Sequence, residues 1–265
     1  MTIFPPLSYR IFPAAQNSPE RSPIIFLHGF AATGEQLWVR TGWVKRFTAE
    51  GYPCIIVDLP YHRNEDLKNP DPSLTYTGDI PLPEEHGFFV SAAHAVAQFI
   101  DELDAPAHLV GFSAGARIAW EASSYAGHNV LSTSIGGLPQ HDHLPLIAQY
   151  LLGSLEQENI NPTFPAVINH SLIRESSLKH FACLPLAFDF DPTLLHPLCP
   201  ILLVRGSEDS VAGDYSWLTE ALTEAHVPYE QLILDGRNHV NALTSGVFKK
   251  RVLALVQESE EAFII

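Results

Sequence analysis

HLVGFSAG, residues 108–115, leads from an apolar strand through a serine between two glycines into a helical pattern. In this context the pattern G-x-S-x-G predicts a sharp strand-to-helix turn that exposes the central serine, Ser113, as a nucleophile. Gly111 and Gly115 fit that turn, because a Cβ at either position would strike the neighbouring strand or helix. The Ser113 hydroxyl is therefore expected at the carboxyl edge of a parallel sheet, where open α/β folds bind ligands. The N–H groups that open the following helix would favour negative charge there.

A base must remove the proton of a serine hydroxyl before the oxygen becomes a good nucleophile. Our candidate is His239, which ends the polar segment 235–239 between the last predicted strand and the last predicted helix. The chain has 13 histidines, so the residue type alone carries little information. Position singles out His239, whereas histidines such as His94, inside a helical pattern, are expected to be core or surface residues.

The base in turn needs a carboxylate that fixes its tautomer and stabilises the imidazolium. The apolar run 200–204 leads into Arg-Gly-Ser-Glu-Asp, so Asp209 is expected at the mouth of a buried strand. Glu208 and Asp214 are the competing carboxylates. Asp214 is expected to cap the next helix instead, since aspartate is favoured at helix N-termini.

Two N–H donors are needed for the negative charge that develops on a carbonyl oxygen under attack. The N–H of Ala114, directly after the nucleophile, is one candidate. The second is the N–H of Phe30, in the segment LHGF at 27–30 after the first long strand. Gly29 would let the backbone turn into the site, and His28 is expected to hydrogen-bond locally and hold that loop.

Short apolar runs alternate with longer amphipathic patterns along most of the chain. The runs are continuously apolar, which favours strands covered on both faces: Ile24–Leu27, Cys54–Leu59, His108–Phe112, Val130–Ile135, Ile201–Val204 and Gln231–Leu234. The amphipathic segments have helical spacing: Glu35–Glu50, Gly87–Leu103, Ala114–Tyr125, Ser216–Ala225 and Val240–Glu260. The alternation predicts an α/β fold with a doubly wound, mostly parallel central sheet. An initial strand is expected near Ser8–Phe12.

Residues 139–197 interrupt this alternation. They are rich in Pro, Asn and His and contain short helical patterns without a convincing strand, so an inserted helical lid is expected rather than so long a loop. The predicted organisation is a first core part at 1–138, the lid at 139–197 and a second core part at 198–265. Pro70–Pro83 is expected to be a surface loop without chemistry of its own.

The composition disfavours several classes of function. With 15 Lys plus Arg against 30 Asp plus Glu, the net charge of −15 argues against nucleic acid and anionic membrane surfaces, because both require a basic patch. No apolar run approaches the roughly 18 residues of a membrane-spanning helix, and residues 1–16 lack the pattern of a signal peptide. Three cysteines are too few for a disulfide framework. We therefore expect a soluble, cytoplasmic protein, and nothing indicates its oligomeric state.

Together these motifs resemble the α/β-hydrolase fold superfamily, from about residue 23 to 265. The matching segments are HGF at 28–30, DLP at 58–60, GFSAG at 111–115, GSED at 206–209 and NH at 238–239. The resemblance implies a lid where the insert lies and a triad of Ser113, Asp209 and His239, in that chain order, with no cofactor or metal. It is weak on substrate, because the superfamily includes esterases, lipases, thioesterases, peptidases, lyases and perhydrolases. A serine at the turn argues against haloalkane dehalogenases and most epoxide hydrolases, which have aspartate there.

Two segments depart from the family pattern. The family often reads D-x-P-G-H-G, whereas Tyr61, His62 and Arg63 follow Asp-Leu-Pro here, which is expected to bring Tyr61 or His62 near the pocket rim. The usual G-x-G-H before the catalytic histidine reads GRNH at 236–239, so that approach is bulkier and more polar. Both changes bear on specificity and not on the triad.

Arg117 lies four residues after Ser113, on roughly the same helix face. This resembles the elbow of the menaquinone-pathway lyases that form a cyclohexadiene carboxylate, in which a nearby arginine holds a carboxylate. Alternatively, Arg117 forms a surface ion pair with Glu121 at i, i+4. His28, Phe112 and Arg117 are the candidate substrate contacts.

The first functional hypothesis is a serine hydrolase of carboxylic esters or thioesters that works through an acyl-enzyme. Apolar side chains in the insert favour a small-molecule acyl substrate that is neutral and partly apolar: Leu144, Leu146, Ile147, Leu151, Leu152, Phe164, Phe181 and Phe188. The alternatives are a carboxylate-directed lyase and a non-catalytic binding protein of the same fold. The run His-Asp-His at 141–143 could suggest a metal site, but the chemistry of this fold needs none.

Overall fold

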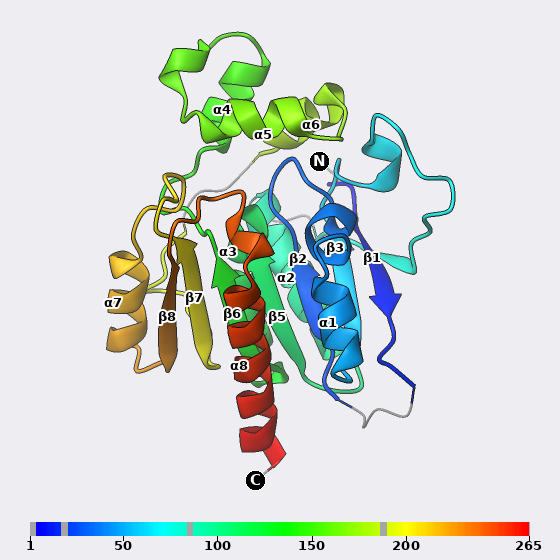
Figure 1. The fold of residues 1–265 in the computed structure, drawn as a ribbon, viewed down its shortest axis with the longest axis vertical. Coiled ribbons are helices and arrows are strands. Elements are labelled where there is room, and N and C mark those ends of the chain that lie inside the picture. Colours follow the sequence, from blue (N-terminus) through cyan, green and yellow to red (C-terminus); the bar gives the residue numbers. More distant parts are fainter. Residues whose placement is uncertain (1–3, 17–20, 84–86, 186–189, 265) are drawn as a thin grey trace.

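The computed structural model describes residues 4–16, 21–83, 87–185 and 190–264. Within them the chain forms a sheet of eight strands in the order β4-β1-β3-β2-β5-β6-β7-β8 (Figure 1). Six strands run parallel: β2 (Ile24–Leu27), β3 (Cys54–Asp58), β5 (Ala107–Phe112), β6 (Val130–Gly136), β7 (Ile201–Gly206) and β8 (Tyr229–Leu234). At one edge β1 (Leu7–Phe12) pairs antiparallel with β3 and with β4 (Gly78–Ile80). The predicted α/β fold is confirmed.

Helices cover both faces of this sheet. α1 (Trp43–Ala49) and α8 (Gly246–Ile264) pack on one face, and α2 (Phe88–Asp101), α3 (Ala114–Ala126) and α7 (Ser216–Glu224) contribute to the core on the other. Successive side chains of a strand point to opposite faces. Phe26 therefore packs in the core under α1 and α8, and Leu27 packs in the core under α2, α3 and α7. Because both faces are covered, the strands read as unbroken apolar runs.

The register of the parallel strands brings their carboxyl ends to one edge. Leu27 lies opposite Gly111, Phe112 opposite Gly136, and Gly136 opposite Val204. The loops that follow β2, β5, β6 and β7 therefore leave the sheet side by side. This edge is where the predicted site residues converge.

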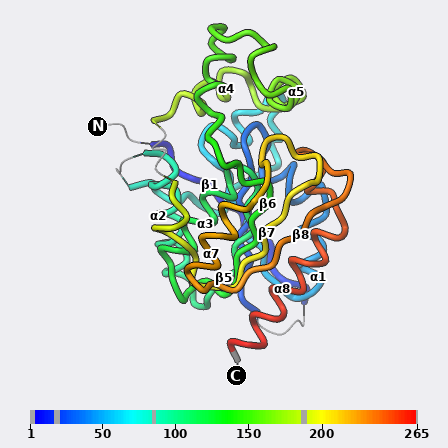
Figure 2. Tube along the Cα trace, turned by 90° about the vertical axis from the view of Figure 1, so that its left-hand side faces the viewer, coloured from blue at the N-terminus to red at the C-terminus, as the bar shows by residue number. Residues whose placement is uncertain are grey.

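The insert 139–197 lies over the same edge through residues 139–185, whereas its Leu195 carbonyl accepts the indole N–H of Trp120 in α3 at 2.7 Å. It carries α4 (Leu144–Leu151), α5 (Thr163–His170) and α6 (Glu175–Ala182), which form a separate layer above the sheet in both views (Figure 1, Figure 2). Among its described residues the segment adds no strand to the sheet, and its single bridge joins Ile173 to Leu67.

Three sequence expectations need correction. The helix expected at Glu35–Glu50 is two elements, a π-helix at Glu35–Val39 and α1, separated at Gly42. The last helix begins at Gly246 rather than Val240, after a short 3-10 turn. The surface loop expected at Pro70–Pro83 contains the edge strand β4. None of the described helices combines the length and the apolar character that crossing a bilayer requires.

Candidate active site

Ser113 sits in a strained turn between β5 and α3. Its φ of 55° lies in the left-handed region, where a residue with a Cβ is held only by its surroundings. Its N–H donates to the Gly136 carbonyl at 2.8 Å, which ties the turn to β6. A Cβ at Gly111 would clash with the backbone at the start of α3, and one at Gly115 would clash with the carbonyl groups at the end of β2. The two glycines therefore have the steric role expected from the sequence.

His239 connects Ser113 to Asp209. Its Nε2 lies 3.1 Å from the Ser113 Oγ, and its Nδ1 lies 2.9 Å from Asp209 Oδ2 and 3.1 Å from Oδ1. The histidine is only 7 % exposed, and its ring packs on Phe112 with 5.2 Å between centroids. The structure thus joins the three residues, from three different loops, in one hydrogen-bonded chain.

Asp209 is held as the partner of His239. Its Oδ1 also accepts the N–H groups of Val211 and Ala212 at 3.0 and 2.9 Å. Burial by itself would raise the pKa of Asp209, but the hydrogen bonds and charge interaction with His239, together with these N–H groups, bring the pKa below its ordinary value. Asp214 instead accepts the N–H of Ser216 at the start of α7 and is exposed, as expected of a cap.

The loop after β2 lies directly against Ser113. A Cβ built on Gly29 would be 2.9 Å from the Ser113 Cβ and 3.5 Å from its Oγ, so only glycine lets this backbone approach so closely. Phe30 and Ala114 line the same pocket as Ser113. The N–H of Ala114 is among the first of α3, and these have no partner within the helix. The residues that carry the two expected donors therefore line the pocket that contains Ser113.

His28 and Phe112 do not line this pocket. His28 is fully buried, with Nδ1 donating to the Gly29 carbonyl at 2.8 Å and Nε2 accepting the Leu59 N–H at 3.0 Å. Burial lowers its pKa to about 4, against the smaller effect of the Gly29 hydrogen bond. The ring of Phe112 packs against the ring of His239. Of the three candidate substrate contacts, only Arg117 reaches the pocket wall.

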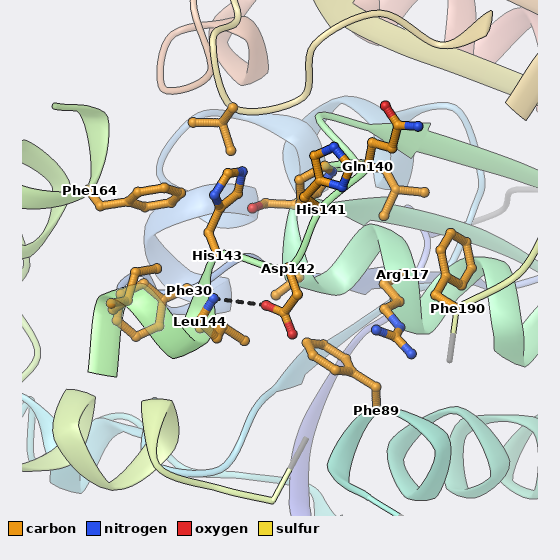
Figure 3. A pocket seen from close by; sticks show the side chains of 16 residues that line it. Phe30, Phe89, Arg117, Gln140, His141, Asp142, His143, Leu144, Phe164 and Phe190 are labelled. Atoms are coloured by element: carbon orange, nitrogen blue, oxygen red, sulfur yellow. Dashed lines mark hydrogen bonds between the residues drawn. The ribbon is translucent and has the colours of Figure 1, made fainter. Parts of the chain in front are cut away.

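Arg117 combines the two alternatives that the sequence left open. Its Nη2 lies 3.2 Å from Glu121 Oε1, and this pair is buried rather than exposed. Its guanidinium also lies over the rings of Phe89 and Phe190, 4.7 and 5.2 Å from their centroids. Figure 3 shows Arg117 beside Phe89 and Phe190 at one end of the pocket, with Asp142 nearby. Burial raises the pKa values of Glu121 and Asp142, and the charge of Arg117 acts against that rise in both, so two carboxyl groups already interact with it.

The remaining pocket wall comes mainly from the 139–197 segment. Leu144, Ile147 and Phe164 line the pocket as expected, whereas Leu146 and Leu152 point to solvent and Leu151 and Phe181 are buried elsewhere. Phe188 lies outside the described residues. Sequence reasoning did not identify Phe89, Leu138, Gln140, Phe190 and Val211, which complete the wall and carry no motif. Tyr61 or His62 was expected near the rim, but neither belongs to this wall, and His62 is fully buried.

His141 and His143 line the pocket on either side of Asp142. The Asp142 Oδ1 accepts the Leu144 N–H at 2.8 Å, which Figure 3 marks. The described residues contain no group of three or more His, Cys, Asp or Glu side chains suited to a metal ion. The run contributes to the pocket wall and directly precedes α4.

Comparisons with known proteins agree on the fold. A family model described as "Alpha/beta hydrolase family" matches residues 24–247. Solved structures with the same fold include MenH from S. aureus (16% identity, 96% of this chain and 99% of that chain, TM-score 0.62). Others are the carboxylesterase CesB (YbfK) from Bacillus subtilis (16%, 94% and 91%, 0.59) and the esterase EaEST from Exiguobacterium antarcticum (16%, 95% and 95%, 0.62). A search of curated protein sequences finds no significant match.

Proposed function

This chain belongs to the alpha/beta hydrolase family, and on that premise we propose that it is a serine hydrolase of carboxylic esters or thioesters. The observation that carries the proposal is the continuous chain Ser113–His239–Asp209, with contacts of 3.1 and 2.9 Å. A nucleophile, a base and an orienting carboxylate in hydrogen-bond contact are what acyl transfer requires.

In the proposed mechanism, the Ser113 Oγ attacks the acyl carbon while His239 Nε2 takes the hydroxyl proton. The carbonyl π electrons move onto oxygen, where the N–H groups of Phe30 and Ala114 stabilise the negative charge. Collapse expels the alcohol or thiol, which receives the proton from His239, and leaves an acyl-enzyme. Water then attacks the acyl carbon while His239 Nε2 takes one of its protons. The second tetrahedral intermediate collapses, the bond from the acyl carbon to Ser113 Oγ breaks, and Oγ takes the proton back from His239 as the acid departs. Asp209 keeps the proton on Nδ1 throughout and stabilises the imidazolium.

The pocket wall supports a neutral, partly apolar acyl group. Leu144, Ile147 and Phe164 face the space beside Ser113, together with the ring of Phe30. The net charge of −15 would repel anionic substrates at long range. We therefore place neutral, partly apolar acyl esters or thioesters ahead of charged ones.

A carboxylate-directed lyase is the second candidate, favoured by the position of Arg117 in the pocket wall. Its contact with Glu121 weakens this reading, because a substrate carboxylate would have to compete with a partner already held at 3.2 Å. The non-catalytic alternative does not account for the Ser113–His239 contact.

A fluorophosphonate probe tests the proposal, because it phosphonylates an activated serine and not an ordinary hydroxyl. We expect the native protein to be labelled and the Ser113→Ala variant to be unlabelled. The same variant should lose about 10⁴-fold or more of any p-nitrophenyl ester turnover. Native protein that resists labelling while a control hydrolase reacts would refute the hydrolase function.

A further inference from the structure

Ala31, directly after the proposed donor Phe30, is held in an unfavourable backbone conformation. Its φ is 63°, in the left-handed region that costs a residue with a Cβ about 1–2 kcal/mol. Its N–H donates to His62 Nε2 at 3.0 Å, and its carbonyl accepts the Ser171 hydroxyl at 2.7 Å. Two side chains from distant parts of the sequence thus fix both polar groups of this residue.

The contact from His62 is fixed in direction. His62 is fully buried, and its Nδ1 donates to the Pro60 carbonyl at 2.8 Å, which leaves Nε2 as the acceptor for Ala31. Burial, with a further contribution from His28, lowers the pKa of His62 to about 3. The ring therefore stays neutral near physiological pH and can accept this N–H.

Ser171 lies in segment 139–197, the segment that covers the pocket. Ser171 lies between α5 and α6, its hydroxyl accepts the Ile173 N–H at 3.1 Å, and its carbonyl accepts Lys68 Nζ at 2.7 Å. On the following helix, Phe181 stacks on Phe30 with 5.9 Å between centroids. The covering segment therefore contacts the Phe30–Ala31 loop through a hydrogen bond and through a ring.

We propose that Ser171 is a positioning residue for the oxyanion site. By holding the Ala31 carbonyl, it keeps the Phe30 N–H directed at the reacting oxygen and so couples the docking of segment 139–197 to turnover. The inference rests on the proposed hydrolase function. Its physical basis is that an oxyanion donor acts only when it is aligned before the reaction, since a misplacement of about 1 Å can cost on the order of 10²-fold in rate.

The expected signature is a change in kcat rather than in KM. Ser171→Ala removes the donor to Ala31 and lets the loop relax, which weakens the transition state more than the bound ester. Losing one oxyanion donor outright costs about 10²–10³-fold, so a misdirected donor should lower kcat about 10- to 100-fold and change KM less than about threefold. Ser171→Thr, which retains the hydroxyl, should restore kcat to within about threefold of native.

Ser177→Ala is the matched control. Ser177 is a buried serine of the same segment, and its hydroxyl donates to Asp66 Oδ1 at 2.8 Å without touching Ala31. Each alanine variant removes one hydrogen bond between segment 139–197 and the core, and Ser171→Ala also removes the acceptor of the Ile173 N–H. Both melting temperatures should therefore fall, that of Ser171→Ala at least as far as that of Ser177→Ala. Only Ser171→Ala should lose kcat.

The experiment measures kcat and KM for p-nitrophenyl acetate on the full chain, with the melting temperature of each variant. Equal kcat losses in the two alanine variants, or a rise in KM alone, would overturn the positioning role. Ser171→Cys, close in size but a weaker donor, gives the same comparison should Ser171→Ala not fold. Native protein that neither reacts with the fluorophosphonate nor turns over the ester would overturn the proposed function. If the native protein is labelled and active but Ser171→Ala has the native kcat, only this inference is overturned.

Discussion

Asp209 and Asp214 follow the same strand, yet only Asp209 contacts the histidine. Asp209→Asn places an amide against His239 Nδ1 and favours the wrong tautomer, so we expect kcat to fall on the order of 10⁴-fold. Asp214→Asn alters only an exposed contact at the start of α7 and should change kcat less than about threefold. Ester hydrolysis by the two folded variants measures the difference, and a larger loss for Asp214→Asn would assign the acid role to that residue.

Arg117 decides between neutral and carboxylate-bearing substrates. Because Glu121 already pairs with it, Arg117→Ala should lower kcat/KM for a neutral short-chain ester less than tenfold, or under ~1.4 kcal/mol. The native enzyme should show no preference for esters that bear a free carboxylate. A loss beyond about a hundredfold confined to carboxylate-bearing substrates would support the lyase instead.

The control for this prediction concerns stability. Arg117→Ala leaves Glu121 buried without this partner, and removing one member of a buried pair costs about 3–5 kcal/mol. The double variant Arg117→Ala/Glu121→Gln removes the stranded charge of Glu121. If the single and the double variant have the same kcat/KM, the change in kcat/KM comes from the pocket and not from partial unfolding.

The residues that sequence reasoning located are those marked by a motif at the end of a strand. Ser113, Asp209 and His239 each follow a predicted strand, and parallel strands bring such positions together. His28 also ends a strand, but adjacency in sequence does not tell which way a side chain points, and it points into the core. The contact of Ser171 with Ala31 spans 140 positions and carries no local signal.

At the scale of elements, strands covered on both faces were readable from their unbroken apolar runs. β4 was not, because a three-residue strand in a polar stretch is defined by its pairing with β1 and not by its own composition. The helix expected at Glu35–Glu50 has an amphipathic pattern throughout. The helix is interrupted because Gly42 adopts a left-handed backbone conformation. The spacing of apolar residues does not indicate a backbone conformation.

Gly42 and Gly246 allow a test of that interruption. Neither has an atom within 4 Å of an added Cβ, but Gly42 has a φ of 83° and Gly246 lies in the first turn of α8. Gly42→Ala should therefore destabilise the fold by about 1 kcal/mol. Gly246→Ala should stabilise it by about 0.4–1 kcal/mol, because it restricts the unfolded chain. Urea unfolding checks both signs, and equal effects would mean that backbone conformation does not set the break.

For the whole molecule, buried histidines make stability depend on pH. Burial lowers the pKa of His28 to about 4 and those of His62 and His108 to about 3, from an ordinary 6.5. Between these values the unfolded chain binds protons that the folded chain does not, so the free energy of unfolding decreases as pH falls below 6.5. Asp58 acts in the opposite sense, since burial raises its pKa to about 6. Burial also lowers the pKa of His143 and raises the pKa values of Glu121 and Asp142. Four imidazoles thus act against three carboxyls, and we expect a net loss of stability in mild acid.

His108 provides the cleanest test, because it lies at the start of β5, at the opposite end of that strand from Ser113. Its Nδ1 contacts the Ser132 hydroxyl at 2.7 Å, and its Nε2 lies 4.0 Å from Glu260. In His108→Gln, the slope of the free energy of unfolding between pH 4.5 and 5.5 should fall by about 1.4 kcal/mol per pH unit, the value of one proton. His128→Gln is the control, because His128 is exposed and loses little hydration on folding. An unchanged slope in His108→Gln would show that the folded protein keeps the imidazole protonated in this pH range. The charge of Glu260 would then outweigh the effect of burial on the pKa of His108.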